Sequence, residues 1–418
     1  MCDLICQLGG FASTIGTNLL TEGGSMSKTI VFCADGTWNG PDEQATTDSN
    51  SPEDTQGCEP QLTNVCKLFA WLDGALLPGG TNWGGVEMEK SLQDASGAPT
   101  QIAKYIHGVG NSQQLLDKVA GGAFGVGVVA RIARGYTYIS RNFVAGDSIV
   151  IVGFSRGAYT ARALAGLIAG EGLLRPDFVA IDDDTRYDTA VAAWYRWRHG
   201  HDTTFQKIAD GLIELLEIHR AFSNAKSLDA SSFVPMKITA VAVWDTVGSL
   251  GIPIYYAGAA IDLFRFCDTA LSANINLGVH AVSLDEQRKP FEPTLWDANP
   301  NVTQALFPGG HCDIGGGYPE HGLSDGPLLW VVDRLQHPDV GLKFALRPPV
   351  DVMSEPLGPR HRAWAGNPVW LAAGVSPRIF PSGMLLNDAV RQRMNGQPED
   401  LDDTQGPQPP YSPLNLPA

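Results

Sequence analysis

A glycine-flanked serine between an apolar run and a small-residue segment constrains the fold more than any other feature of this sequence. Ser148–Phe154 is a continuous apolar run with β-branched residues, which is typical of a central parallel strand covered on both faces. Gly153-Phe-Ser-Arg-Gly157 follows, and Ala158–Ile168 has a helical pattern. Strand, sharp turn and helix form the setting of a nucleophile elbow. The sequence therefore predicts that Ser155 is a nucleophile, with an ordinary glycine-rich turn as the alternative.

Further apolar segments indicate the rest of the fold. Short runs rich in strand formers occur in four other places, and helical patterns separate them. The expected strands are 29–34, 101–108, 238–244 and 302–307, and the expected helices are 65–72, 121–143 and much of 171–230. Strands that alternate with helices favour an α/β fold with a mostly parallel central sheet and helices on both faces.

The chain divides into three parts by composition. Residues 1–27 contain no basic residue before Lys28 and are expected to be a disordered leader. Residues 28–347 form the predicted catalytic domain, with a small helical cap near 171–235. Residues 348–418 are rich in proline, and we expect an extension that packs on the domain and is loose at its end.

Charge and cysteine content limit the partners and the compartment. The net charge of -16 disfavours nucleic acid and anionic membranes, so contact with a membrane surface would have to be apolar. Seven irregularly spaced cysteines without a C-x-x-C pair fit a reducing compartment. No apolar stretch reaches about eighteen residues, so no transmembrane helix is expected. These features predict a cytoplasmic protein or one exported without a signal peptide. They say nothing of its oligomeric state.

A nucleophilic serine needs a base and an acid that orients the base. In this type of fold, the acid and then the histidine follow the serine along the chain. Asp245 directly follows the expected strand 238–244, and His311 follows the strand 302–307 in a loop with five glycines. We therefore predict a triad of Ser155, Asp245 and His311. A capping aspartate and a structural histidine are the alternatives.

Other residues compete for these roles. Asp262, Asp268 and Asp285 lack a preceding apolar strand, His280 lies in an apolar helix-like segment, and His321 lies in a polar loop. A metal site is a further alternative, but its candidate ligands match no standard zinc spacing, so no metal and no cofactor are predicted. Those ligands would be His311, Asp313, His321 and Asp325.

Loops near the serine are expected to complete the site. The backbone N–H of Arg156 would be one oxyanion donor, and Gly36 and Thr37 would offer the second. Alternatively or in addition, Asp35 and Asn39 would fix that loop through side-chain bonds. Aromatic side chains are candidates for an apolar acyl pocket, although core packing is the ordinary role of such residues. They are Trp38, Trp194, Tyr195 and Trp197.

Five motifs occur together in order and carry a resemblance to a known family. They are Asp35-Gly-Thr-Trp-Asn39, Gly153-Phe-Ser-Arg-Gly-Ala-Tyr-Thr-Ala-Arg162, Val243-Trp-Asp-Thr-Val-Gly248, Leu284-Asp-Glu-Gln-Arg288 and Phe307-Pro-Gly-Gly-His-Cys-Asp-Ile-Gly-Gly-Gly-Tyr318. From about residue 28 to 335 the chain resembles the α/β-hydrolase family that includes type VI secretion phospholipase effectors, the Tle class. The resemblance implies a Ser-Asp-His triad and ester hydrolysis, in some relatives at the acyl ester of phospholipids.

The function predicted at this point is serine hydrolysis of carboxylic esters through an acyl-enzyme, with a lipase or phospholipase A activity as its sharper form. The alternatives are a soluble carboxylesterase that acts on small or polymeric esters and a non-catalytic effector or binding protein on the same fold. Relatives that act on lipid often carry large membrane-facing modules, for which this chain has little room outside 171–230.

Overall fold

A nine-stranded, mostly parallel sheet forms the centre of the molecule. The computed structural model describes residues 27–36, 62–77, 87–108, 123–176, 183–201, 227–247, 254–256, 259–261, 269–348, 351–365, 367–399 and 410–417. The strand order is β13-β12-β11-β8-β5-β1-β4-β3-β2. All pairs from β13 to β4 are parallel, and β3 is antiparallel to β4 and to β2. This arrangement confirms the predicted α/β class.

The strands of the sheet have these bounds: β1 Thr29–Ala34, β2 Ala75–Leu76, β3 Glu87–Gln93, β4 Pro99–Ile106, β5 Ser148–Phe154, β8 Ala240–Trp244, β11 Gly278–Ser283, β12 Val302–Phe307 and β13 Leu385–Leu386. Two small hairpins lie outside it, β6 Leu173–Leu174 with β7 Phe233–Val234, and β9 Ile254–Tyr256 with β10 Ala259–Ile261. The predicted strands therefore appear, whereas the helical interpretation around His280 is wrong, because that residue lies in β11. The apolar run around His280 is so short that the spacing of its apolar residues cannot distinguish a strand from a buried helix.

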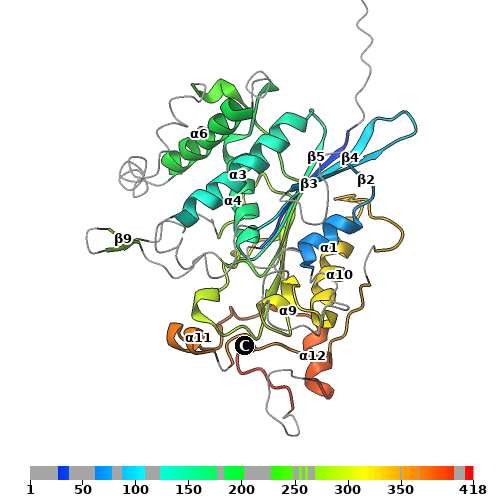
Figure 1. Ribbon diagram of the computed structural model, residues 1–418, viewed down its shortest axis with the longest axis vertical. Coiled ribbons are helices and arrows are strands. Elements are labelled where there is room, and N and C mark those ends of the chain that lie inside the picture. Colours follow the sequence, from blue (N-terminus) through cyan, green and yellow to red (C-terminus); the bar gives the residue numbers. More distant parts are fainter. Residues whose placement is uncertain are drawn as a thin grey trace, which may run out of the picture.

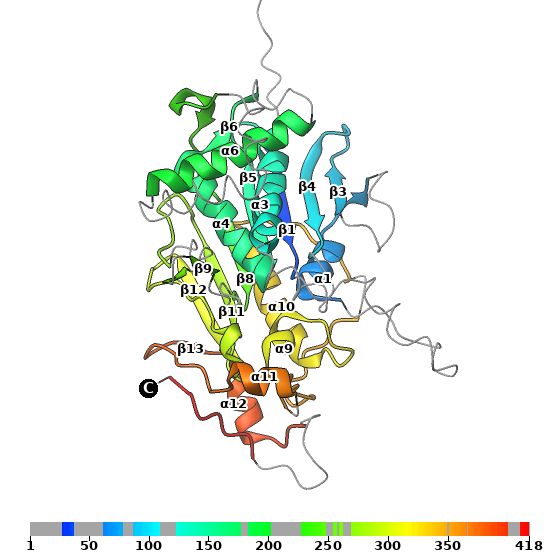
Figure 2. The same cartoon turned by 60° about the vertical axis from the view of Figure 1, so that its left-hand side comes forward.

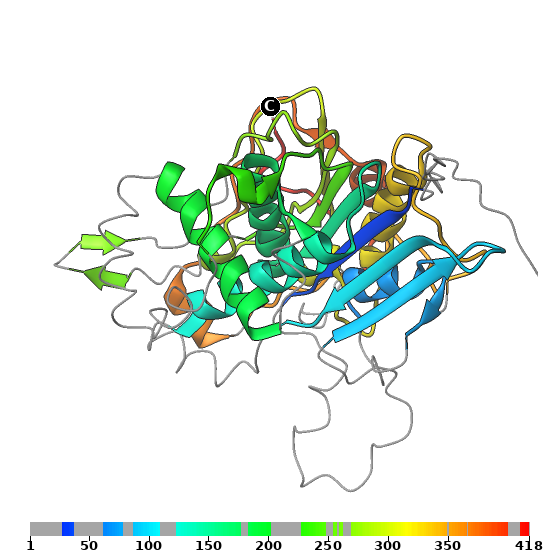
Figure 3. The ribbon, with the colours of Figure 1, turned by 90° about the horizontal axis from the view of Figure 1, so that it is seen from above.

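Helices cover both faces of the sheet. α3 (Ala123–Asn142), α4 (Arg156–Glu171) and α6 (Asp183–His201) lie on one side, and α1 (Asn64–Trp71) and α10 (Gly322–Gln336) lie on the other (Figure 1). Seen from above, the sheet separates the green helices from blue α1 and yellow α10 (Figure 3).

The side chains of β5 point alternately into two hydrophobic cores, one on each face of the sheet. Ile149 and Ile151 pack in the core under α3 and α4, whereas Val150 and Val152 pack in the core under α1 and α10. Successive side chains of a strand point to opposite faces, so a strand buried on both faces must be apolar throughout. α6, in the expected cap region, packs against α3, and most of the remainder of that region lies outside the described residues.

The C-terminal segment closes the end of the sheet that carries the carboxyl ends of the strands. It contains α11 (Pro368–Ala373), β13 and α12 (Asp388–Asn395), which lie with α9 (His311–Gly315) at one end of the molecule (Figure 2). Phe380, Val390 and Tyr411 from this segment form a third core cluster with side chains of β11, β12 and Leu284. Two short 3-10 turns, η2 (Ala230–Ser232) and η3 (Lys289–Phe291), complete the regular structure of the residues that are described. None of the described helices has the length and hydrophobicity of a membrane-spanning segment.

Candidate active site

Ser155 occupies a strained turn between β5 and α4. Its φ of 58° is in the left-handed region that non-glycine residues rarely adopt. A Cβ on Gly153 would lie 2.4 Å from the carbonyl oxygen of Gly157, and a Cβ on Gly157 would lie 2.1 Å from that of Ala34. Only glycine fits at these two positions, so the G-x-S-x-G pattern follows directly from the close approach of strand, turn and helix.

Asp245 follows β8, the strand beside β5. It is fully buried and, with a φ of 35°, is the second non-glycine residue in the left-handed region among the residues described. Its Oδ1 accepts a hydrogen bond of 2.9 Å from the backbone N–H of Ser283, at the end of β11. The neighbouring strand therefore holds one oxygen of the carboxylate in place.

His311 begins α9 just after β12 and connects the other two residues. Its Nε2 accepts a hydrogen bond from the Ser155 hydroxyl at 2.8 Å, and its Nδ1 donates one to Oδ2 of Asp245 at 2.5 Å. The strands before these residues, β5, β8 and β12, are parallel, so their carboxyl ends meet at one edge. The three predicted triad residues thus lie in hydrogen-bonding order although they are far apart in the chain.

Burial and charge set the protonation states in the hydrogen-bonded series Ser155–His311–Asp245, here called the relay. Burial lowers the pKa of His311, and the hydrogen bond and charge of Asp245 oppose that effect. Burial alone would raise the pKa of Asp245, but the charge of Arg378 and the hydrogen bond with His311 hold it well below its usual range. A neutral imidazole beside an ionised carboxylate is the state that a general base requires.

Aromatic rings hold the imidazole on two sides. The ring of Phe154 lies 4.7 Å from that of His311, and the ring of Phe291 lies 4.9 Å away at a nearly perpendicular angle. Phe291 in turn packs edge-on against Trp370 of α11. The imidazole is therefore confined to the plane in which it reaches both Ser155 and Asp245.

Arg378 is a site residue that the sequence did not predict. Its Nη1 donates to Oδ1 of Asp245 at 2.7 Å, and its Nη2 donates to Oδ2 at 3.0 Å. It lies in the proline-rich segment, 133 residues after Asp245, and it is buried. An arginine at such a distance leaves no spacing signal, so nothing in the sequence could have marked it.

Glu286 connects the Leu284-Asp-Glu-Gln-Arg288 motif to the histidine. Its carboxylate accepts from the backbone N–H of His311 at 3.2 Å and from Nε and Nη2 of Arg288 at 2.9 and 2.8 Å. The guanidinium of Arg288 stacks 3.6 Å above the ring of Phe291. The motif therefore supports the histidine loop and the aromatic side chains around it.

Asp313 fixes the glycine-rich loop that leads to His311. It accepts from the backbone N–H of Gly310 at 2.8 Å, from the backbone N–H of His361 at 3.0 Å and from Nδ1 of His361 at 2.7 Å. His361 also stacks on Tyr318 with ring centroids 3.7 Å apart. Like Arg378, His361 comes from the C-terminal segment.

The Asp35 loop lies against the nucleophile. A Cβ on Gly36 would be 3.4 Å from the Cβ of Ser155. The carboxylate of Asp35 accepts from the Gly36 N–H at 2.6 Å, from the Thr63 hydroxyl at 2.7 Å and from the Tyr105 hydroxyl at 2.6 Å. Asp35 thus fixes this loop by side-chain bonds, as one of the two hypotheses expected, and it engages the Gly36 N–H. Thr37, Trp38 and Asn39 lie outside the described residues.

The other aromatic candidates are far from the serine. Trp194, Tyr195 and Trp197 are buried in the core beside α4, and Trp197 packs against Gly166 and Gly170. Gly166 is eleven residues after Ser155, which is roughly 16 Å along a helix. Core packing therefore accounts for their positions.

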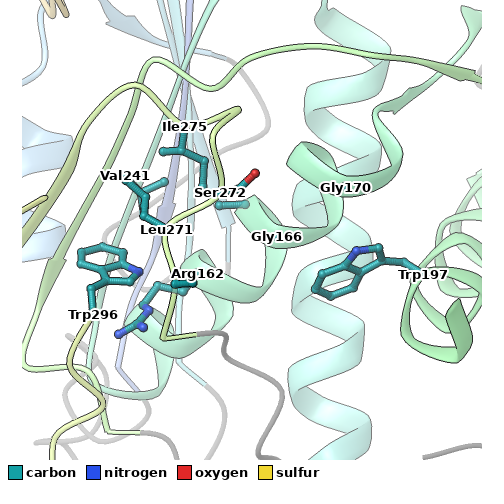
Figure 4. A pocket seen from close by; sticks show the side chains of 11 residues that line it. Arg162, Gly166, Gly170, Trp197, Val241, Leu271, Ser272, Ile275 and Trp296 are labelled. Carbon is teal, nitrogen blue, oxygen red and sulfur yellow. The ribbon is translucent and has the colours of Figure 1, made fainter. Parts of the chain in front are cut away.

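A cavity of about 130 Å³ lies in the same region, between α4 and the loop before β11. Trp197, Leu271, Trp296 and Arg162 are among its lining residues (Figure 4). The guanidinium of Arg162 lies 4.4 Å from the centre of the Trp296 ring. The cavity is separate from the Ser155 hydroxyl and takes no part in the relay.

The competing histidines have structural partners. Nε2 of His280 accepts from the backbone N–H of Thr246 at 3.0 Å, and burial lowers the pKa of this core histidine to about 3. Nδ1 of His321 bonds Asp325 at 2.6 Å, and Asp325 also pairs with Lys67. Asp262 and Asp268 lie outside the described residues. Within the part of the chain that the structure describes, no group of three histidine, cysteine or acidic side chains could hold a metal ion.

The parallel sheet and the strand-to-helix turn at Ser155 define a member of the α/β-hydrolase class. Within that class, residues 28–334 match the family model of the Tle1-like catalytic domain of type VI secretion phospholipase effectors. The match covers most of the sequence, and the chain belongs to this family.

Individual relatives are more distant. An uncharacterized protein of Saccharomyces cerevisiae is 26% identical over 294 residues, which are 69% of this chain and 35% of the relative. An uncharacterized protein from Pseudomonas aeruginosa has a crystal structure with a TM-score of 0.38 and 17% identity, over 76% of this chain and 46% of that one. The structure of the Tle1 effector bound to the VgrG spike gives a TM-score of 0.36 and 17% identity, over 70% and 52%. The chain thus spans about a third to a half of these proteins.

Proposed function

We propose that this protein is a serine hydrolase that cleaves the carboxylic esters of phospholipids. The observation that carries the proposal is the continuous relay from the Ser155 hydroxyl through His311 to the buried Asp245. A base within hydrogen-bonding reach of a nucleophile, itself oriented by a carboxylate, is the arrangement that acyl transfer requires. Membership of a phospholipase effector family supports the choice of substrate.

In the proposed reaction, the Ser155 oxygen attacks the ester carbonyl while Nε2 of His311 takes the hydroxyl proton. The tetrahedral intermediate collapses, the carbon–oxygen bond to the alcohol breaks, and the imidazolium returns the proton to the leaving alcohol. Water then attacks the acyl-enzyme with His311 again as base, the bond between the acyl carbon and the Ser155 oxygen breaks, the imidazolium returns its proton to that oxygen, and the carboxylic acid leaves. Asp245 keeps Nδ1 protonated and stabilises the imidazolium.

Backbone N–H groups would stabilise the oxyanion. Arg156 is the first residue of α4, and the first N–H groups of a helix have no acceptor within it. The Gly36–Thr37 backbone is the second candidate. In the structure the Gly36 N–H donates to Asp35. No step needs a cofactor.

Ester hydrolysis by the wild type and Ser155→Ala, compared on short soluble esters and on phospholipid vesicles, tests the proposal. We expect the wild type to cleave both substrates and the variant to cleave neither above background. Cleavage of short esters alone would keep the triad but replace the phospholipase with a soluble carboxylesterase. A variant as active as the wild type would remove Ser155 as nucleophile. Failure of a fluorophosphonate probe to label the wild type would favour the non-catalytic alternative.

We also propose export without a signal peptide, since the matching family model is that of type VI secretion phospholipase effectors. Contact with a membrane surface would then occur at the target. Comparison of the secreted protein from strains with and without a working type VI apparatus tests this route, and equal export from both strains would contradict it.

A further inference from the structure

The C-terminal segment holds the acid of the relay through one buried side chain. Arg378 lies outside the matched residues 28–334 and is 3% exposed. Its two terminal nitrogens engage the two carboxylate oxygens of Asp245 at 2.7 and 3.0 Å. The same guanidinium donates to the backbone carbonyl oxygens of Ser283, at 2.8 Å, and of Phe291.

This geometry controls the plane of the carboxylate. Oδ2 of Asp245 accepts from both Arg378 and Nδ1 of His311, while Oδ1 accepts from Arg378 and the Ser283 N–H. A planar, two-pronged guanidinium fixes both oxygens at once, which a lysine ammonium cannot do. The orientation of the imidazole therefore depends on the position of Arg378.

Arg378 also connects the acid to the ring that packs on the base. Phe291, whose carbonyl accepts from Arg378, places its side chain against the imidazole of His311. One side chain thus contacts the aspartate, the end of β11 and the segment that carries Phe291. A residue that only attached the C-terminal segment to the sheet would not need to engage both oxygens of the one carboxylate that His311 uses.

We propose that Arg378 is a positioning residue of the catalytic relay and that the C-terminal segment thereby completes the active site. It acts through Asp245 on His311 and does not touch the substrate. The expected effect of Arg378 on the reaction rate rests on the proposed function. Its electrostatic effect on the Asp245–His311 pair is independent of any substrate.

Arg378→Gln and Arg378→Lys in the full chain test this proposal, with Arg393→Gln as the matched control. Arg393 is equally buried in the same segment, but it donates to the backbone carbonyls of Pro356, Gly358 and Glu399 and lies apart from the triad. The readouts are the pH profile of kcat/KM, the pH profile of Ser155 labelling by a fluorophosphonate, and titration of the His311 ring by NMR.

We expect Arg378→Gln to lower kcat/KM by about 10- to 100-fold, the scale of a small misplacement of a catalytic group. Without the guanidinium charge, the buried Asp245–His311 pair takes up a proton at higher pH, so the acid limb and the NMR titration move up by about one unit. Arg378→Lys keeps the charge and should restore most of the pH profile but less of the rate. Arg393→Gln should reduce the melting temperature and leave the profile unchanged.

Two results distinguish a failure of the Arg378 proposal from a failure of the proposed hydrolase function. If His311 titrates at the same pH in the wild type, Arg378→Gln and Arg378→Lys, Arg378 is only a structural contact, whatever the activity. If Ser155→Ala keeps the wild-type activity, the proposed function fails, whatever the titration shows.

Discussion

The sheet and the C-terminal segment contribute to the same site in different ways. The strand ends supply Ser155, Asp245 and His311, two of them in strained backbone conformations. The C-terminal segment supplies partners for three acidic residues, the triad residue Asp245 and two in the loops near it: Arg378 for Asp245, His361 for Asp313, and Tyr411 for Asp285. The groups proposed to react thus belong to the matched domain, and groups that hold them in place come from outside it.

The difference predicts two kinds of response to substitution. Substitutions at the strand ends should abolish hydrolysis, because an interaction made in the transition state is lost. Changes in the C-terminal segment should alter stability and pH dependence, because a buried carboxylate loses a partner. The substitutions below test whether the two regions respond in these two ways.

Asp245→Asn should have the largest effect. An amide in place of the carboxylate favours the wrong tautomer of His311, which costs about 10⁴-fold in kcat in serine proteases. Hydrolysis under single-turnover conditions measures the loss. Asp285→Asn is the control, because the side chain of this buried residue bonds Gly309 and Tyr411 rather than the His311 ring. Equal losses in the two variants would mean that both carboxylates act through the fold.

Gly157→Ala should destabilise the fold strongly. The added Cβ would meet two backbone carbonyl oxygens, those of Ala34 at 2.1 Å and Asp35 at 2.5 Å, and backbone cannot move aside as a side chain can. We expect a loss of about 4 kcal/mol or more in the free energy of unfolding, measured by urea denaturation. Gly97→Ala has a φ of +85° with open space around the Cβ and should cost only about 1 kcal/mol. Similar costs would contradict the close-approach explanation.

His361→Ala should have an intermediate effect. Asp313 would lose the ring partner at 2.7 Å while remaining buried, which costs about 1–3 kcal/mol, and kcat/KM should fall by less than about 10-fold because His311 keeps both partners. Thermal unfolding and steady-state kinetics measure the two effects. His337→Ala removes an exposed histidine paired with Asp339 and should change neither. A loss of activity as large as that of Asp245→Asn would break the proposed division.

Tyr411→Phe should have the smallest effect. It removes the hydroxyl that donates to Asp285 at 2.8 Å and keeps the ring in the third core cluster. We expect a loss of about 1 kcal/mol in the free energy of unfolding, with unchanged kcat/KM. A change in the pH profile of kcat/KM would show that Tyr411 reaches the relay through Asp285.

Local patterns were enough to predict most of the fold and the three residues of the relay. Ser148–Phe154 is predicted as a strand covered on both faces because it is apolar after its first residue, and the glycines around Ser155 indicate a close approach of backbones. Asp245 is predicted because it directly follows one strand, and His311 because it lies in the glycine-rich loop after another. Those roles stay predictions, although the structure brings the atoms together.

Sequence patterns were less informative for short segments and for side chains whose neighbours are distant in the chain. The helical interpretation around His280 is wrong because a segment of six residues, such as β11, is too short to show a period. For Trp194, Tyr195 and Trp197 the sequence leaves both an acyl pocket and core packing open, because an aromatic cluster looks the same in either setting; the structure places all three in the core beside α4.

The sequence by itself determined the sheet, the strained turn and the order of the candidate triad, because each depends on residues that are neighbours in the chain. Only the tertiary structure decided that Arg378 holds Asp245 from 133 residues away. A buried carboxylate requires a partner but does not specify where in the chain that partner lies. The proline-rich segment is thus the part of the chain whose role the sequence indicates least, yet it makes one of the closest contacts to the relay.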